Sequence, residues 1–466
     1  MHSSSSAPAN QALSPTTPSE RVFALHDHAA LWFSLGVGLL VMQVGAYLLP
    51  ALSTQQAVLA IICGSLLGAG LLGWMAKIAC DTGLSSAALM THVYGRQFAK
   101  LPILLNLVQL IGWGTFELVV MRDASVAIAR QAGGMAASHW PVVMTLVWGA
   151  VIGLLISGSM LKLVRQLIAR IALPLVVLSL LWLTWHFVGL ALEQGWQGIW
   201  QRPGTGGMGW LPAMDLVVAM PISWLPLVAD YARHGRDGRS ALRGTWLGFG
   251  LANVWCYGLG VLITLTLPSE NLVTALLLAQ GGLIALTLIL IDEVDNAYGD
   301  TYSGAMAAHS MAPRWSLRRW GLGLTVVCVL LALVLPMHSI EPFLLMLSSV
   351  FVPLFGVILG RLAWQAADQR LAQAPQWLAQ ARGAHWPAVL LWLAGVGFYH
   401  GVPLLAPAAG SALPTLLVCF VLARLLPRAA PAQCPQASRN LVGLSRRFIA
   451  KHDQKHDSGH ISRIFL

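Results

Sequence analysis

Long apolar stretches alternate with short polar ones between Ala29 and Leu426. A run of about 20 apolar residues is long enough to cross the hydrocarbon core of a bilayer as a helix. This pattern predicts an all-α polytopic membrane protein with twelve transmembrane helices. The predicted spans are 29–50, 56–76, 101–130, 141–161, 168–192, 212–231, 243–267, 274–298, 320–336, 341–364, 386–405 and 411–426.

The two ends of the chain lack this pattern. Residues 1–28 begin with a serine-rich stretch and have no apolar periodicity, and we expect a disordered cytoplasmic tail there. Residues 427–466 form a second predicted cytoplasmic tail. His452, His456 and His460 are spaced four apart in it, a spacing that suits metal chelation on a helix. Because this segment has almost no apolar face, we expect disorder and no metal site.

Composition agrees with the apolar pattern. The chain is 57% hydrophobic and only 10% charged, whereas a soluble chain carries roughly 25% charged residues. A soluble multidomain protein is therefore excluded. The six cysteines are scattered without CxxC spacing, which indicates neither a disulfide framework nor a zinc site. No phosphate-binding glycine loop, HExxH pair or GxSxG turn occurs, so we predict no catalytic residue and no cofactor.

The net charge of +10 suggests a nucleic-acid partner until the basic residues are placed. With the predicted spans, 25 of the 28 Lys and Arg fall on one side of the membrane, and the exceptions are Arg122, Arg130 and Arg202. Basic residues concentrate in cytoplasmic loops. The charge therefore predicts orientation in a cell (inner) membrane, with both termini cytoplasmic, and no nucleic-acid partner.

Two predicted spans contain residues that interrupt helices. Pro221 and Pro226 flank Ser223 and Trp224 in the sixth span, which we expect to unwind in mid-membrane. The first span carries Gly36, Gly38, Gln43 and Gly45. Membrane helices break only where the freed backbone groups are buried in protein or face water, so breaks indicate sites.

The two interrupted spans lie about 180 residues apart, and the same displacement carries the third span onto the eighth. Residues 29–192 and 212–364 then form two five-helix halves, followed by two extra helices in 386–426. This pattern predicts a five-plus-five inverted repeat with discontinuous first and sixth helices. The alternative is that these residues mark nothing, because glycine and proline are common in membrane helices.

The third span carries a polar stripe. Asn106, Gln109, Trp113 and Glu117 recur every three to four residues and share one helical face. We interpret the stripe as a substrate wall, in which Trp113 stacks on a planar ring and Glu117 pairs with ring N–H groups or takes up a proton. The alternative role for Glu117 is an internal ion pair with Arg122.

The eighth span ends in a very acidic segment. Asp292, Asp295 and Asn296 share one face, and these carboxylates can bind a coupling cation or relay protons. If the helix ends near Ile291, the same residues belong to a cytoplasmic loop. At the end of the sixth span, Asp230 and Arg233 are predicted to form a gate or structural latch, paired with each other or with a neighbouring loop.

The same residues resemble a known family, the purine-cytosine permeases of the nucleobase-cation symporter group. The sixth-span run is most similar to the hydroxymethylpyrimidine branch of that family. The resemblance extends over all twelve predicted spans. The matching stretches are 82–86, 106–113, 220–231, 300–305 and 350–356.

The resemblance implies a symporter that imports a nucleobase-like ring, such as hydroxymethylpyrimidine or cytosine, with Na⁺ or H⁺. The substrate-binding residues that it implies, together with the polar stripe, are Gln43, Gln109, Trp113, Glu117, Ser223, Trp224 and Asn296. The cation-coupling candidates are Leu39, Met42, Asp292 and Asp295. Relatives usually carry small hydroxyl residues where this chain has the two aspartates, which leaves the coupling ion open.

Other functions remain open from the sequence. A polytopic membrane enzyme would use the buried carboxylates for acid–base or metal chemistry. A same-fold transporter would carry a different small solute. A channel is disfavoured because no polar stripe repeats along several spans. The apolar pattern predicts the lipid bilayer as a partner, and the resemblance implies a small heterocycle. Neither predicts an oligomeric state.

Overall fold

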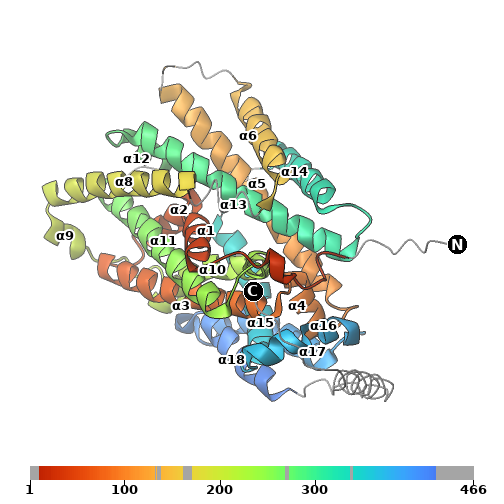
Figure 1. Ribbon diagram of the computed structural model, residues 1–466. Coiled ribbons are helices and arrows are strands. Elements are labelled where there is room, and N and C mark those ends of the chain that lie inside the picture. Colours follow the sequence, from red (N-terminus) through yellow and green to blue (C-terminus); the bar gives the residue numbers. More distant parts are fainter. Residues whose placement is uncertain are drawn as a thin grey trace, which may run out of the picture. The chain divides into compact units, whose positions relative to one another are not determined.

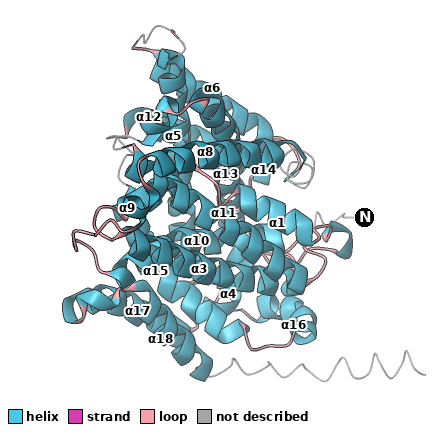
Figure 2. Cartoon of the chain, turned by 90° about the vertical axis from the view of Figure 1, so that its left-hand side faces the viewer, coloured by secondary structure: helices cyan, strands magenta, loops and turns pink. Residues whose placement is uncertain are grey.

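The structure is a computed structural model that describes residues 10–131, 133, 138–160, 170–267, 272–335, 340–381 and 383–426. The predicted C-terminal tail lies outside these residues, and so do the basic loop residues Lys162 and Arg165. The described part is almost entirely helical (Figures 1 and 2). Its helices are α1 (Leu25–Ser34), α2 (Leu39–Tyr47), α3 (Thr54–Thr82), α4 (Ser86–Tyr94), α5 (Lys100–Gln131), α6 (Trp140–Ile156), α8 (Leu173–Glu193), α9 (Trp196–Trp200), α10 (Trp210–Ala232), α11 (Gly238–Thr266), α12 (Leu272–Leu278), α13 (Gly282–Met311), α14 (Leu317–Val334), α15 (Ile340–Leu362), α16 (Ala367–Gln380), α17 (Trp386–Leu405) and α18 (Ala412–Leu425), with short 3-10 turns at Pro18–Glu20 and Pro407–Ala409.

Many of these helices can cross a bilayer. Among the described residues, eight are long and apolar enough, and α1 with α2 passes the same test as one bent pair. The helices α6 and α18 are apolar but shorter. The protein is therefore a multi-pass membrane protein, and the count of twelve spans stays a prediction.

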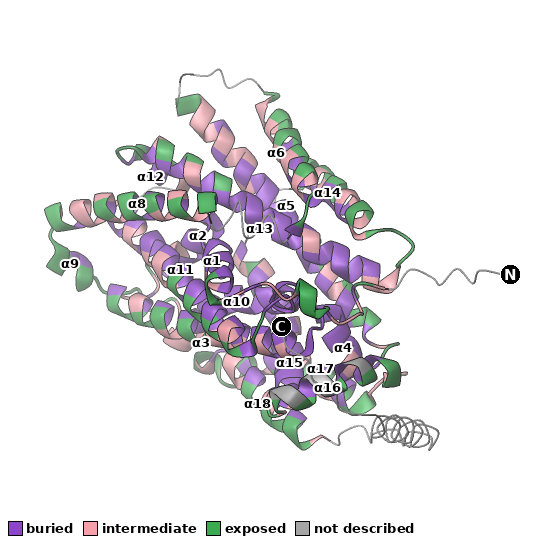
Figure 3. Ribbon diagram, viewed as in Figure 1, coloured by how far each residue is buried: buried purple, intermediate pink, exposed green. Residues whose placement is uncertain are grey.

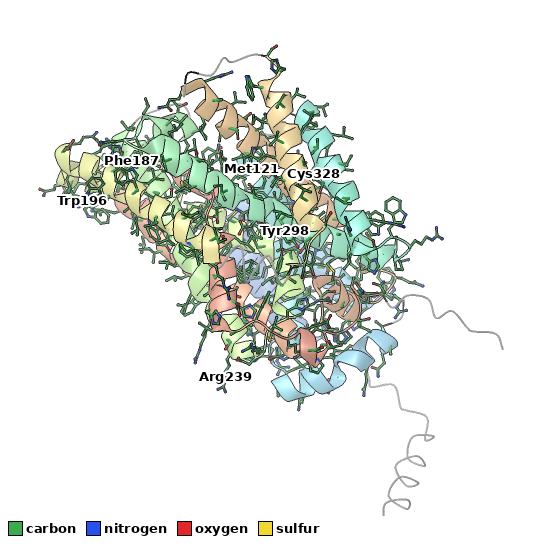
Figure 4. The ribbon with its side chains drawn as sticks, turned by 45° about the horizontal axis from the view of Figure 1, so that its top comes forward. Met121, Phe187, Trp196, Arg239, Tyr298 and Cys328 are labelled. Atoms are coloured by element: carbon green, nitrogen blue, oxygen red, sulfur yellow. The ribbon has the colours of Figure 1, made fainter. Side chains whose placement is uncertain are left out.

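Burial differs strongly between the helices. Figure 3 shows α10 and much of α13 in the buried colour, whereas α6, α8 and α14 carry exposed residues along their outer sides. In Figure 4, Tyr298 of α13 lies among the helices, while Trp196 of α9 and Arg239 of α11 lie at the periphery. The polar segment of α13 is thus held inside the protein, away from lipid.

The first predicted span is interrupted, as its glycines indicated. Helix α1 ends at Ser34, α2 begins at Leu39, and their axes differ by 63°. Gly36 is required by close packing, because a Cβ atom there would lie 2.8 Å from the Ala252 Cβ on α11. The break therefore fits against α11 and opens the backbone in the middle of the helix bundle.

The sixth predicted span is not interrupted, and that prediction was wrong. Helix α10 continues through Pro221 and Pro226. Proline lacks the N–H that would bond the carbonyl four residues earlier, and for Pro221 this is the carbonyl of Val217. The Tyr257 hydroxyl donates to that carbonyl at 3.1 Å. A side chain thus replaces the donor that Pro221 removes, and the helix continues.

The eighth predicted span was placed too early. A short helix, α12, occupies the start of 274–298, and α13 begins after Gly281, whose φ of 70° suits glycine. The acidic residues Asp292 and Asp295 therefore lie in the interior of a 30-residue helix and are buried. The alternative that these residues form a cytoplasmic loop was therefore wrong. It arose because the carboxylates lower the hydropathy of a helix segment that faces protein and not lipid.

The N-terminal segment is more ordered than predicted over residues 10–28. Phe23 is fully buried, and its backbone bridges Gly235 between α10 and α11. The Thr16 hydroxyl donates to the Arg233 carbonyl at 2.8 Å, and Arg21 donates to the Cys80 carbonyl at 3.2 Å. The segment looked disordered because its partners lie in three distant loops and helix ends, which local composition does not reveal.

We expect Tyr257→Phe to lower the free energy of unfolding by about 1 kcal/mol, because the Val217 carbonyl loses its donor. In a Pro221→Ala background the residue at 221 regains an N–H for that carbonyl, and the same substitution should cost much less. Denaturant unfolding of the four proteins of this double-mutant cycle in detergent measures both losses. Equal losses in the two backgrounds would show that the hydroxyl does not substitute for the proline.

Candidate functional site

Five buried carboxyl groups lie on two neighbouring helices, α5 and α13. They are Glu117 on α5 and Asp292, Glu293, Asp295 and Asp300 on α13, and none is more than 6% exposed. Among the described residues, no Lys, Arg or His forms an ion pair with any of them. A buried charge without a partner is very costly. The cluster therefore requires protons, a cation or a cationic ligand for neutralisation.

Glu293 and Asn296 close the break between α1 and α2. The Leu39 N–H donates to Glu293 Oε1 at 2.5 Å. The Asn296 amide donates to the Val37 carbonyl at 3.2 Å and to Glu293 Oε2 at 3.3 Å. A carboxylate at a helix N-terminus is also favoured by the helix dipole. The backbone groups freed by the interruption are thus satisfied by two α13 side chains.

Gly38 allows this close approach. A Cβ atom at Gly38 would lie 3.1 Å from Glu293 Oε1, which is tighter than ordinary contacts. A side chain there would push the carboxylate away from the Leu39 N–H. The glycines that indicated an interruption in the sequence therefore serve two packing contacts, one with α11 and one with α13.

A second face of α13 points to the end of α1. The Ser34 hydroxyl donates to Asp292 Oδ1 at 2.6 Å. Asp295 lies one turn further along the same helix, and both of its oxygens lack a hydrogen-bond partner, as does Asp292 Oδ2. These aspartates are the predicted cation-coupling pair. Ser34, the last residue of α1, links Asp292 to the start of the break.

Glu117 contacts the acidic helix directly. Its carboxyl group lies beside that of Glu293. Two neighbouring carboxyl groups form a hydrogen bond when one of them carries a proton. The alternative ion pair with Arg122 was wrong, since Arg122 binds Asp123 at 2.6 Å and the Ala332 carbonyl at 2.8 Å.

The polar stripe of α5 faces α10. The Gln109 amide donates to Asn106 Oδ1 at 3.0 Å and to the Ser223 carbonyl at 3.1 Å. Ser223 precedes Trp224, so the stripe is tied to the backbone beside that ring. Trp113 lies on the next turn of the stripe and Glu117 on the turn after, which brings the third-span and sixth-span candidates to the same region.

Edge-to-face contacts hold the two tryptophan rings. Trp113 meets Phe343 of α15 at 5.1 Å between centroids and 77° between planes. Trp224 meets Trp32 of α1 at 6.2 Å and 89°. A Cβ atom at Gly299 of α13 would lie 3.8 Å from the Trp224 ring. Neighbouring aromatic rings therefore orient both indoles, and α13 presents its smallest residue to one of them.

Two first-span candidates contact residues outside this cluster. Gln43 donates to the Tyr47 hydroxyl at 2.7 Å, and the Met42 carbonyl packs against Gly260 of α11. Leu39 does contact the cluster, through its N–H and not through a carbonyl. The prediction put the opened backbone at Leu39–Gln43, whereas the break precedes Leu39, so Met42 and Gln43 are part of a regular helix.

The predicted latch at the end of α10 pairs with neighbouring segments. Asp230 accepts from the Ser86 N–H at 3.1 Å, at the start of α4. Arg233 donates to the Gln11 carbonyl at 3.3 Å in the N-terminal segment. Burial lowers the pKa of the adjacent His234 to about 4, so that imidazole is neutral at pH 7. The residues join loops at the end of α10, consistent with a structural latch.

Sequence reasoning missed Glu293 and Asp300. The chosen face of α13 contained Asp292, Asp295 and Asn296, but Glu293, Asn296 and Asp300 form a second stripe at three- and four-residue spacing. Helical periodicity alone would have revealed it. What the sequence could not reveal is that this stripe faces Glu117 and the α1–α2 break.

Known proteins share this architecture. Residues 15–420 match the family described as permeases for cytosine/purines, uracil, thiamine and allantoin. Mhp1, a nucleobase-cation-symport-1 family transporter solved in a closed conformation with bromovinylhydantoin bound, has a TM-score of 0.74 at 16% identity over 89% of this chain and 93% of that chain. MhsT in complex with L-phenylalanine has a TM-score of 0.56 at 15% identity over 86% and 98%. No curated protein sequence matches the chain.

A mutant of the manganese transporter of Eremococcus coleocola is also similar, with a TM-score of 0.52 at 16% identity over 86% of this chain and 92% of that chain. These likenesses confirm the predicted fold class, an all-α polytopic transporter fold. The boundaries of its two halves stay a prediction.

We expect the Glu117–Glu293 hydrogen bond to hold a proton at neutral pH. Infrared spectra of the purified protein should show a protonated-carboxyl band that weakens in Glu117→Gln, because the amide removes one member of the pair. Glu193→Gln on the exposed end of α8 is the matched control and should leave the band unchanged. An identical band in Glu117→Gln and wild type would contradict a proton shared by this pair.

Proposed function

This chain belongs to the family of permeases for cytosine/purines, uracil, thiamine and allantoin, and from that premise we propose that it is a symporter that imports a pyrimidine ring together with a proton. Membership in a family of permeases makes it a transporter and excludes the membrane enzyme that the sequence left open. We further propose that it lies in the inner membrane with both termini cytoplasmic, as its basic loops indicate.

The observation that carries this proposal is the meeting of three elements at Glu293. The break between α1 and α2 and the acidic face of α13 are joined there by hydrogen bonds through Leu39 and Asn296, and Glu117 of the α5 stripe lies beside Glu293. Transporters of inverted-repeat architecture place substrate and coupling ion at such discontinuous helices. The same region contains both planar indoles and groups able to exchange a cation.

In the proposed complex the ring lies between Trp113 and Trp224. Indole faces stack on planar heterocycles. Gln109, Glu117 and Asn296 then hydrogen-bond the ring edge, with Ser223 as a backbone neighbour. The family description names cytosine and uracil, and Mhp1 holds a hydantoin, also a small planar ring. These descriptions support the ring class, and the choice of a pyrimidine such as hydroxymethylpyrimidine or cytosine is our proposal.

We assign coupling to Asp292 and Asp295, and we propose the proton as the coupling ion in place of sodium. Both side chains are buried in a region that has no basic counter-charge among the described residues, and carboxyl groups in such places neutralise by binding protons. The proximity of Glu117 and Glu293 supports the proton, because two neighbouring buried carboxyl groups repel each other unless one of them is protonated. Leu39 contributes an N–H to the neighbouring Glu293 and is not proposed as a cation ligand.

Trp113→Ala should raise the half-saturation concentration for pyrimidine uptake by at least about tenfold, because stacking on an aromatic side chain contributes roughly 1–3 kcal/mol. Radiolabelled uptake into proteoliposomes, with cytosine, uracil, hydroxymethylpyrimidine, purines and hydantoins as competitors, measures this effect. Trp185→Ala, on the exposed side of α8, is the matched control and should transport normally. Wild-type kinetics in Trp113→Ala would remove Trp113 from the ring site.

Asp292→Asn should uncouple uptake from the proton gradient, because an amide cannot bind and release a proton at neutral pH. We expect a pH gradient to drive accumulation in wild-type proteoliposomes and to have at most a small effect in the variant, which then only equilibrates the ring. Glu193→Gln should keep the wild-type response. If accumulation depends on a sodium gradient and not on a pH gradient, the proton is not the coupling ion, although the protein is still a symporter.

A further inference from the structure

The polar atoms left without partners at the ring site are mostly acceptors. They are Gln109 Oε1, Glu117 Oε2 and Asn296 Oδ1, and the unpartnered donors are Trp113 Nε1 and Trp32 Nε1, the latter on the ring that meets Trp224. All five side chains are at least nine-tenths buried. A buried polar atom without a partner costs about 1–3 kcal/mol. A ligand that supplies donors to these oxygens therefore gains most from binding.

The amide orientations are fixed by the surrounding bonds. The Gln109 NH₂ group donates to Asn106 Oδ1 and the Ser223 carbonyl, which only accept. The Asn296 NH₂ group donates to the Val37 carbonyl and to Glu293. Turning either amide over would place an oxygen against these acceptors. Both amide oxygens must therefore remain available as acceptors for a ligand.

Glu117 contributes the carboxyl acceptor of the set. One of its oxygens is engaged with Glu293, and Oε2 remains unpartnered. The Leu39 N–H and the Asn296 amide hold Glu293 in turn. Glu293 is thus a positioning residue that keeps Glu117 directed with one oxygen free. A carboxyl oxygen forms strong hydrogen bonds with the N–H groups of a ligand.

We propose that the site selects rings with an amidine edge, meaning a ring nitrogen next to a carbon that bears an amino group, over rings with a carbonyl at that carbon. The inference rests on the proposed function and specifies its substrate class. The amino group donates to Glu117 Oε2 and to an amide oxygen. A carbonyl in the same place sets its oxygen against Glu117 Oε2 and the amide oxygens, which then remain without a donor.

The experiment compares matched ligands on the wild-type protein. Competition against labelled uptake, and thermal stabilisation of the detergent-purified protein, are measured for an aminopyrimidine, its oxo counterpart and its dimethylamino counterpart. The dimethylamino ring keeps the basic ring nitrogens but has no N–H on the exocyclic group. We expect the amino ring to bind about tenfold to a hundredfold better than either analogue, as one mismatched buried hydrogen bond implies.

Glu117→Gln provides the matched variant. Its amide can donate to a carbonyl, so the preference for amino over oxo rings should fall at least about tenfold, whereas Glu193→Gln should keep the wild-type preference. If the oxo and amino rings bind wild type equally well, the specificity inference is wrong while transport of planar rings stands. If no ring binds or accumulates, the proposed function itself is wrong.

Discussion

The carboxylate of Glu293 holds the interrupted first span in place. It accepts the Leu39 N–H at the start of α2, while Asn296, one turn further along α13, donates to the Val37 carbonyl at the break. In a bilayer core an opened backbone persists only when protein groups satisfy it. The same carboxylate contacts Glu117 of α5. The break, the acidic helix and the polar stripe therefore depend on one another, and loss of Glu293 would leave all three unsatisfied.

The two helices expected to break show which residues open a backbone. In α10 each proline removes a donor, yet the helix continues, and the Tyr257 hydroxyl bonds the Val217 carbonyl that Pro221 leaves free. The α1–α2 break contains no proline. There Gly36 and Gly38 carry no side chain that would clash with Ala252 and Glu293, so the chain can pack closely against both residues. Proline residues alone therefore did not predict where a helix is interrupted. The contacts available to the backbone decided it.

Sequence predicted what depends on local periodicity. The α5 stripe was recoverable because Gln109, Trp113 and Glu117 repeat at helical spacing, and the acidic segment stood out as unsuited to lipid. The limits of α13 were not recoverable from apolar runs, because the very acids that matter lowered its hydropathy. Nor was the docking of residues 10–28, which depends on Phe23 and Thr16 meeting distant loops. The break itself was assigned a few residues too late, because the helix is interrupted before Leu39.

The division of α13 into two faces gives a physical basis for coupling. Asp292 faces Ser34 of α1, Glu293 faces Glu117 of α5, and Asn296 between them binds the backbone of the break. Charges a few ångströms apart interact strongly in a protein interior, where the effective dielectric is far below that of water. In the proposed mechanism, neutralising one face lowers the repulsion felt at the other. A donor-rich ring on Glu117 and a proton on the aspartates then favour each other's binding, and linkage requires the two effects to be equal in free energy.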